Sequence, residues 1–65
     1  MIRVNGEPLK YEPGMTVTDV LRARNFTFRM IAVWINGTLV PRTTYASTVV
    51  PDDADVQVLH MIAGG

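Results

Sequence analysis

The chain has 65 residues, 48% of them hydrophobic, which is enough for one small domain with a compact core, and we expect a single domain over residues 1–65. It contains no cysteine, so disulfides, thiol nucleophiles and cysteine-ligated metal sites are excluded. Six basic residues balance six acidic ones, whereas nucleic-acid binders carry an excess of basic residues. No apolar run approaches the ~20 residues that span a bilayer. We therefore expect a soluble cytoplasmic protein that binds neither nucleic acid nor membrane.

The first predicted element is a β-hairpin. Residues 2–5 alternate apolar and polar side chains, which is the period of a half-buried strand. Asn5-Gly6 favours a type I′ turn, because both central positions of that turn need positive φ. We expect the return strand over residues 8–12. Since Pro8 cannot donate a ladder hydrogen bond, this strand should lie at an edge of the sheet.

A short helix is predicted over residues 17–24. Thr16 is a candidate N-cap, and Asp19 three residues later completes a variant of the capping box. Three apolar side chains at i, i+3 and i+4 form one face: Val17, Val20 and Leu21. Asn25 is a plausible stop. A helix this short is unstable in isolation, so packing on a sheet must hold it.

The second half of the chain is predicted to complete the sheet. In chain order it contains a strand (31–35), a turn (Asn36-Gly37), a return strand (38–40), a loop or short helical turn (42–47), an extended stretch (48–50), a charged turn (52–55) and a final strand (56–62). The helix joins strands at some remove, which allows parallel pairing through a crossover. We therefore predict an α+β fold, a β-grasp (ubiquitin-like) roll with a mixed four- to five-stranded sheet and one main helix on one face.

Alternation along the strands predicts an apolar patch on the sheet face that points away from the helix. Trp34 lies between inward-facing neighbours on its strand, and Leu59 and Met61 alternate with inward-facing valines. Exposed apolar patches mark partner surfaces, so we predict a partner interface of Trp34, Leu59 and Met61, with Arg3 on the same face. A one-residue register shift would instead bury some of these side chains. Arg42 either meets an acidic partner at this interface or caps the following turn.

The chain ends in residues 63–65, Ala63-Gly64-Gly65, which we predict to be a flexible tail. Glycine has no Cβ, so a slim tail of this kind can be threaded through the narrow active site of another enzyme. The carboxylate of Gly65 would then be the reacting group, and Gly64 and Ala63 would occupy the channel. Glycines also occur at frayed chain ends without any function. The dipeptide alone leaves both interpretations open.

Other candidates for chemistry have simpler explanations. His60 is the only histidine, and no Cys, Asp or Glu stands at the sequence spacing from it that a metal site requires. Asp52, Asp53 and Asp55 lack the full ligand spacing and the closing glutamate of a calcium loop, so a charged turn is the better interpretation. No nucleophile–base pair and no glycine-rich phosphate loop are present. We predict that this chain has no catalytic residue, no metal site and no bound cofactor.

Several motifs, taken together and in order, resemble those of one family. They are Ile2-x-Val-Asn-Gly6, Met15-Thr16-Val17-x-Asp19-Val20-Leu21, Val33-x-Ile-Asn-Gly37-x-Leu-Val-Pro-Arg42, the segment 52–55 followed by Val56-x-Val58, and the terminal Gly64-Gly65. With them the chain resembles the ThiS-type sulfur carriers of thiamin biosynthesis, in the ubiquitin-like ThiS/MoaD family. The usual Asp-Gly turn before the last strand is replaced by Asp52-Asp53-Ala54-Asp55, and Trp34 and residues 59–62 are atypical, which leaves the pathway open.

The resemblance implies a reaction at the tail. An E1-like adenylyltransferase would use ATP to adenylate the Gly65 carboxylate, and a persulfide sulfur donor would displace AMP to leave a thiocarboxylate. The resemblance also implies sulfur delivery to thiazole synthase, so the chain would be a protein cosubstrate and not an enzyme. Three alternatives remain: a sulfur carrier for a molybdopterin, tungsten-cofactor or cysteine pathway, a ubiquitin-like modifier joined to lysines, or a non-covalent β-grasp interaction module.

Overall fold

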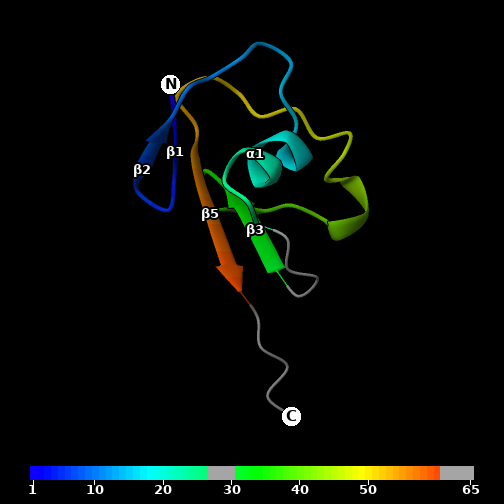
Figure 1. Cartoon of the computed structure of the whole chain (residues 1–65). Helices are drawn as coiled ribbons and strands as arrows, with labels where there is room; N and C mark the ends of the chain where they lie inside the picture. The colour runs from blue at the N-terminus through cyan, green and yellow to red at the C-terminus, as the bar shows by residue number, and fades with distance from the viewer. Residues whose placement is uncertain (27–30, 61–65) are drawn as a thin grey trace.

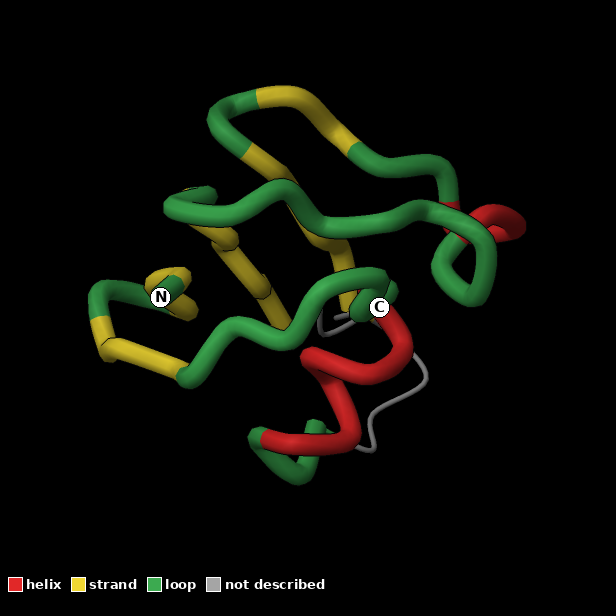
Figure 2. Tube along the Cα trace, turned by 90° about the horizontal axis from the view of Figure 1, so that it is seen from above, coloured by secondary structure: helices red, strands yellow, loops and turns green. Residues whose placement is uncertain are grey.

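The structure, a computed structural model, describes residues 1–26 and 31–60, which form a mixed five-stranded sheet with one α-helix packed against it (Figure 1). The elements are β1 (Ile2–Val4), β2 (Glu7–Leu9), α1 (Val17–Ala23), β3 (Ile31–Ile35), β4 (Thr38–Leu39), the 3₁₀ turn η1 (Arg42–Thr44) and β5 (Asp55–His60). The strand order is β2-β1-β5-β3-β4. Seen from above, α1 lies on one side of the strands (Figure 2). The predicted α+β roll is confirmed.

The parallel pair in the sheet is β1 with β5, in the register Arg3↔Asp55 and Val4↔Val56. The sequence predicted parallel pairing through the helical crossover, but β2 and β3, which flank α1 in the chain, are separated in the sheet by β1 and β5. The last strand, β5, lies in the centre of the sheet. Its alternating valines point to the core, and the inward-facing side chains of both neighbouring strands continue that apolar face. The chain therefore reaches His60 from the middle of the sheet.

Local hydrogen bonds define both ends of α1. The backbone N–H of Thr16 donates to Oδ2 of Asp19 at 2.9 Å, and the N–H of Asp19 donates to Oγ1 of Thr16 at 3.3 Å, which completes the predicted capping box. At the other end Asn25 takes a left-handed φ of 59°, and the N–H of Phe26 donates to the carbonyl of Leu21 at 2.8 Å. Asn25 therefore stops the helix in a Schellman arrangement, as the sequence predicted.

Both Asn-Gly turns form, and both hold β5. Asn5 and Asn36 have φ of 52° and 50°, in the left-handed region that asparagine tolerates. The Asn5 amide accepts from the Val58 N–H at 2.7 Å and donates to the Val58 carbonyl at 3.1 Å. On the other side of β5, Oδ1 of Asn36 accepts from the Asp55 N–H at 2.9 Å. Each turn thus extends the sheet by side-chain hydrogen bonds at a point where the backbone ladder ends.

Several strand boundaries differ from the prediction. The second strand, expected over 8–12, is Glu7–Leu9, because β1 has only three residues to pair with it, in the register Ile2↔Leu9 to Val4↔Glu7. It lies at a sheet edge, as its proline required. The return strand expected over 38–40 is Thr38–Leu39. The final strand begins one residue early, at Asp55, and positions 61–62 of the predicted strand lie outside the described residues.

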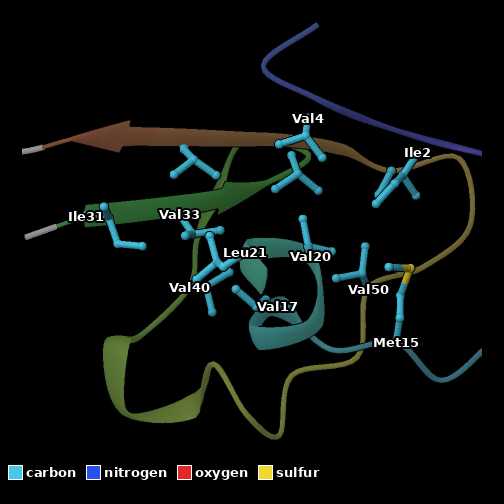
Figure 3. Close-up of a cluster of buried hydrophobic side chains, with 13 residues drawn as sticks. Ile2, Val4, Met15, Val17, Val20, Leu21, Ile31, Val33, Val40 and Val50 are labelled. Atoms are coloured by element: carbon cyan, nitrogen blue, oxygen red, sulfur yellow. The ribbon is translucent and has the colours of Figure 1, made fainter. Parts of the chain in front are cut away.

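The core lies between α1 and the inward face of the sheet (Figure 3). Thirteen buried hydrophobic residues form it: Ile2, Val4, Met15, Val17, Val20, Leu21, Ile31, Val33, Val40, Val50, Ala54, Val56 and Val58. Tyr45 packs against this cluster, and so does Phe26 at the end of the helix. Because all of the inward-facing strand residues are used here, the opposite sheet face carries the remaining side chains.

Candidate partner interface and tail

The predicted reactive tail follows the central strand. Ala63, Gly64, Gly65 and also Met61 lie outside the described residues, so their predicted roles stay predictions. The described chain ends at His60, on a strand that pairs with β1 on one side and β3 on the other. The last described pairings of β5, Ile31↔His60 and Ala32↔Leu59, bring the start of β3 beside the end of β5. The surface around these pairings is therefore the described surface nearest in sequence to the predicted tail.

The outer sheet face carries an apolar patch beside this end of β5. Residues directly opposite each other in neighbouring strands share a face, and the register places Trp34 opposite Leu39 and Ala32 opposite Leu59. Leu59 is 58% exposed and Leu39 is 57% exposed, while Trp34 and Ala32 are half-buried. We call these four residues, Ala32, Trp34, Leu39 and Leu59, the outer patch. The outward orientation predicted for Trp34 and Leu59 agrees with the structure; their role as an interface stays a prediction.

Leu39 is a patch residue that the sequence reasoning missed. The signal was present, because Val40 points into the core and its neighbour on a strand must point outward. The two-residue length of β4 hid this alternation. Leu39 continues the patch from β3 to the edge of the sheet.

The two arginines predicted for the interface lie at different places. Arg3 is exposed on the outer face, opposite Pro8 and Asp55, where the face is polar. Arg42 is exposed at the start of η1, beyond the β4 edge. Strands β5, β3 and β4 lie between the two side chains in the sheet order. The structure therefore places only Arg42 beside the apolar end of the outer face.

Two carboxylates have lowered pKa values, each through local hydrogen bonds. The backbone N–H of Thr16, and then its hydroxyl, lower the pKa of Asp19. The N-terminal ammonium of Met1 donates to Oδ1 of Asp52 at 2.9 Å and lowers the pKa of that carboxyl. The N–H of Asp53 donates to the same Asp52 oxygen at 2.8 Å. Both carboxylates serve the local structure, one at a helix start and one in the charged turn.

Searches for other kinds of site cover the described residues only. Across residues 1–26 and 31–60, no three histidine, cysteine or acidic side chains gather in a way that could hold a metal ion. In the same two ranges, no helix has the length and hydropathy needed to cross a bilayer.

Comparison with known proteins decides the family. A family model described as the ThiS family matches residues 2–65. The chain belongs to the ThiS family. The recognition of a ThiS-type sulfur carrier from its motifs is thereby confirmed. The match extends through the terminal Gly64-Gly65, which the structure does not describe.

Solved structures and curated proteins agree with this family. The crystal structure of the thiamine biosynthesis protein ThiS from Geobacter metallireducens is similar with a TM-score of 0.79 and 28% identity, over 98% of this chain and 97% of that one. A protein named thiazole synthase from Magnetococcus marinus is 38% identical over 98% of this chain. The uncharacterized protein ycf40 of Porphyra purpurea is 31% identical, over 98% of this chain and 90% of its own length. The chain spans only 20% of the Magnetococcus protein.

Proposed function

We propose that this ThiS-family chain carries sulfur for thiazole formation in thiamin biosynthesis, as a thiocarboxylate on Gly65. The observation that carries the proposal is the family match over residues 2–65, which includes the terminal Gly64-Gly65. The names of the relatives support the pathway: the Geobacter structure is a thiamine biosynthesis protein, and two relatives are named thiazole synthase.

The chemistry follows from the reactivity of a carboxylate. A carboxylate resists nucleophiles until one of its oxygens becomes part of a good leaving group. An E1-like adenylyltransferase supplies this by joining the Gly65 carboxylate to the AMP portion of ATP, with release of pyrophosphate. The terminal sulfur of a protein persulfide then attacks the acyl carbon and AMP leaves. A thiol cleaves the resulting S–S bond, and the thiocarboxylate sulfur is free to act as a nucleophile at thiazole synthase.

This chain contributes recognition and reach to that reaction, and its partners contribute the catalysis. ATP is bound by the adenylyltransferase, so the carrier needs no cofactor of its own. The reaction takes place in the cytoplasm. The outer patch, together with Met61 as the sequence predicts, is the surface on which a partner docks while the tail is in its active site. Arg42 supplies positive charge beside the apolar end of this face, and Arg3 supplies it on the polar part, opposite Asp55.

Glycine at positions 64 and 65 is required because a side chain there would obstruct the channel through which the tail passes. We expect Gly64→Val to block thiocarboxylation while leaving the urea unfolding midpoint unchanged, since residue 64 follows the last strand of the sheet by four positions. Normal turnover of this variant would contradict the threading argument.

Intact-mass spectrometry tests the proposal directly. The chain is incubated with ATP, an E1-like adenylyltransferase and a persulfide donor, and a Gly65-deleted chain serves as the control. We expect a mass gain equal to the replacement of one oxygen by sulfur in the full chain only. Isopeptide-linked adducts on lysines would favour a ubiquitin-like modifier instead. No change in either chain, with an enzyme active on another carrier, would favour a non-covalent interaction module.

A further inference from the structure

A hollow lies beside the outer patch, at the edge of the sheet where β4 ends. Its volume is about 330 Å³, at the lower end of the range for ligand pockets. Residues from β3, from the end of β4 and from the segment around η1 line it: Ile31, Ala32, Leu39, Val40, Pro41, Arg42 and Tyr45. The hollow exists because β4 pairs only with Trp34 and Ile35. The chain then turns away through Pro41 and leaves the first half of β3 uncovered on that side by β4.

The hollow and the outer patch form one continuous apolar surface. Ala32 and Leu39 line the hollow and also belong to the patch. Across the sheet, Ala32 is opposite Leu59 on β5, one residue before the described end of that strand. A protein docked on the outer patch would therefore reach the hollow through the shared residues Ala32 and Leu39.

Arg42 lies at the rim of the hollow. Among the described residues that line the hollow, it is the only Lys, Arg, Asp, Glu or His, and it is exposed. Asp55 lies at the start of β5, at the opposite end of that strand from Leu59, and its N–H donates to Oδ1 of Asn36. The surface thus combines an apolar hollow with a positively charged side chain at its edge. A partner that complements it would present an apolar side chain next to a carboxylate.

We propose that this hollow is a docking subsite for thiazole synthase, which seats an apolar side chain of that enzyme while a neighbouring carboxylate of the enzyme meets Arg42. The proposal rests on the proposed sulfur-carrier function. Two relatives favour this partner over the adenylyltransferase. The chain matches only 20% and 19% of the lengths of two proteins that are named thiazole synthase. A carrier-like segment and the rest of a thiazole synthase therefore occur together in one polypeptide. In such a polypeptide, complementary surfaces would let the carrier-like segment dock on the remainder of the protein.

The test compares two reactions of the same tail. Adenylation of the carrier and sulfur transfer to thiazole synthase are each measured as a function of carrier concentration. The variants are Arg42→Glu, Arg42→Lys and Leu39→Thr, with Lys10→Glu as the matched charge-reversal control beyond the opposite edge of the sheet. Leu39 and Arg42 are exposed, so we expect all four chains to fold, and urea unfolding verifies it.

We expect Arg42→Glu and Leu39→Thr each to raise the KM for sulfur transfer about five- to tenfold, from a repelled charge in one and lost apolar contact in the other. The kcat of transfer stays unchanged, because these substitutions alter docking and leave the reacting tail unchanged. Adenylation stays unchanged in Arg42→Glu, Arg42→Lys and Lys10→Glu, Arg42→Lys retains most of the transfer activity, and Lys10→Glu behaves as the parent chain. Leu39 also belongs to the outer patch, so the two reactions are contrasted in the Arg42 variants only.

Three results would overturn the proposal, and they differ from one another. An equal rise of KM in both reactions would assign the hollow to docking in general and not to thiazole synthase. Unchanged KM in both reactions would show that the hollow is not a docking site, while the sulfur-carrier function stands. If the parent chain accepts no sulfur at all, the proposed function itself fails, and this subsite fails with it.

Discussion

Two neighbouring residues of β5, Val58 and Leu59, should separate stability from partner binding when each is replaced. Val58 is 7% exposed and faces α1, while Leu59 is 58% exposed on the outer patch. Full burial of a side chain of this size contributes about 1.5–3 kcal/mol. Leu59 is already 42% buried (100 − 58), so Leu59→Thr should cost the folded chain at most about 1 kcal/mol. Val58→Ala removes core volume and should cost about 2 kcal/mol.

The exposed 58% of Leu59 is what a partner can still bury, and it corresponds to about 1–2 kcal/mol of binding free energy. At about 1.4 kcal/mol per factor of ten, Leu59→Thr should raise the Kd for the adenylyltransferase about five- to thirtyfold. Val58→Ala should leave that Kd unchanged under conditions in which the variant is folded. Threonine is β-branched, which suits a strand, so Leu59→Thr lowers the hydrophobicity of the side chain without lowering its strand propensity.

Urea unfolding followed by circular dichroism measures the first effect, and isothermal titration calorimetry with the adenylyltransferase measures the second. If Leu59→Thr destabilises the chain as much as Val58→Ala does, the outer face is covered in the folded chain and our assignment of faces is wrong. If Leu59→Thr is stable and its Kd is unchanged, the outer patch is not the surface that this partner uses.

Three further predictions concern the turns and caps. Thr16→Ala should lower the free energy of unfolding by about 1 kcal/mol in urea titrations, because it removes the N-cap of α1; an unchanged midpoint would mean that packing alone holds the helix. Asp19 and Asp52 have pKa values below their ordinary 3.8, so the stability that they contribute is present above that pH and lost as the pH falls through the lowered values; in acid titrations of unfolding, Asp19→Asn should weaken this dependence, and an identical pH profile would count against it. Asn36→Ala should lower the free energy of unfolding by about 1–2 kcal/mol because alanine does not favour positive φ. Asn36→Gly should lower it less, since this variant loses only the hydrogen bond to Asp55. Equal losses in urea titrations would show that the hydrogen bond dominates.

The sequence by itself determined the features that depend on residues a few positions apart. The two Asn-Gly turns, the capping box of Thr16 with Asp19 and the stop at Asn25 all form as predicted. Each is set by hydrogen bonds or backbone angles within one turn of chain, which the residue types alone specify. Alternation on the last strand likewise gave the correct faces for its inward valines and for Leu59, because the side-chain period of a strand is a local property.

Only the tertiary structure decided which strands are neighbours. The parallel pairing of β1 with β5 joins residues 52 positions apart, and the bonds from the Asn5 amide to Val58 join residues 53 positions apart. No local pattern encodes such a partner. The same holds for the hollow, where β3, the end of β4 and the segment at Arg42 meet only because β4 stops after two residues. Local chemistry specifies the elements, but the burial of one shared core selects their arrangement, and surfaces assembled from separate elements follow from that selection.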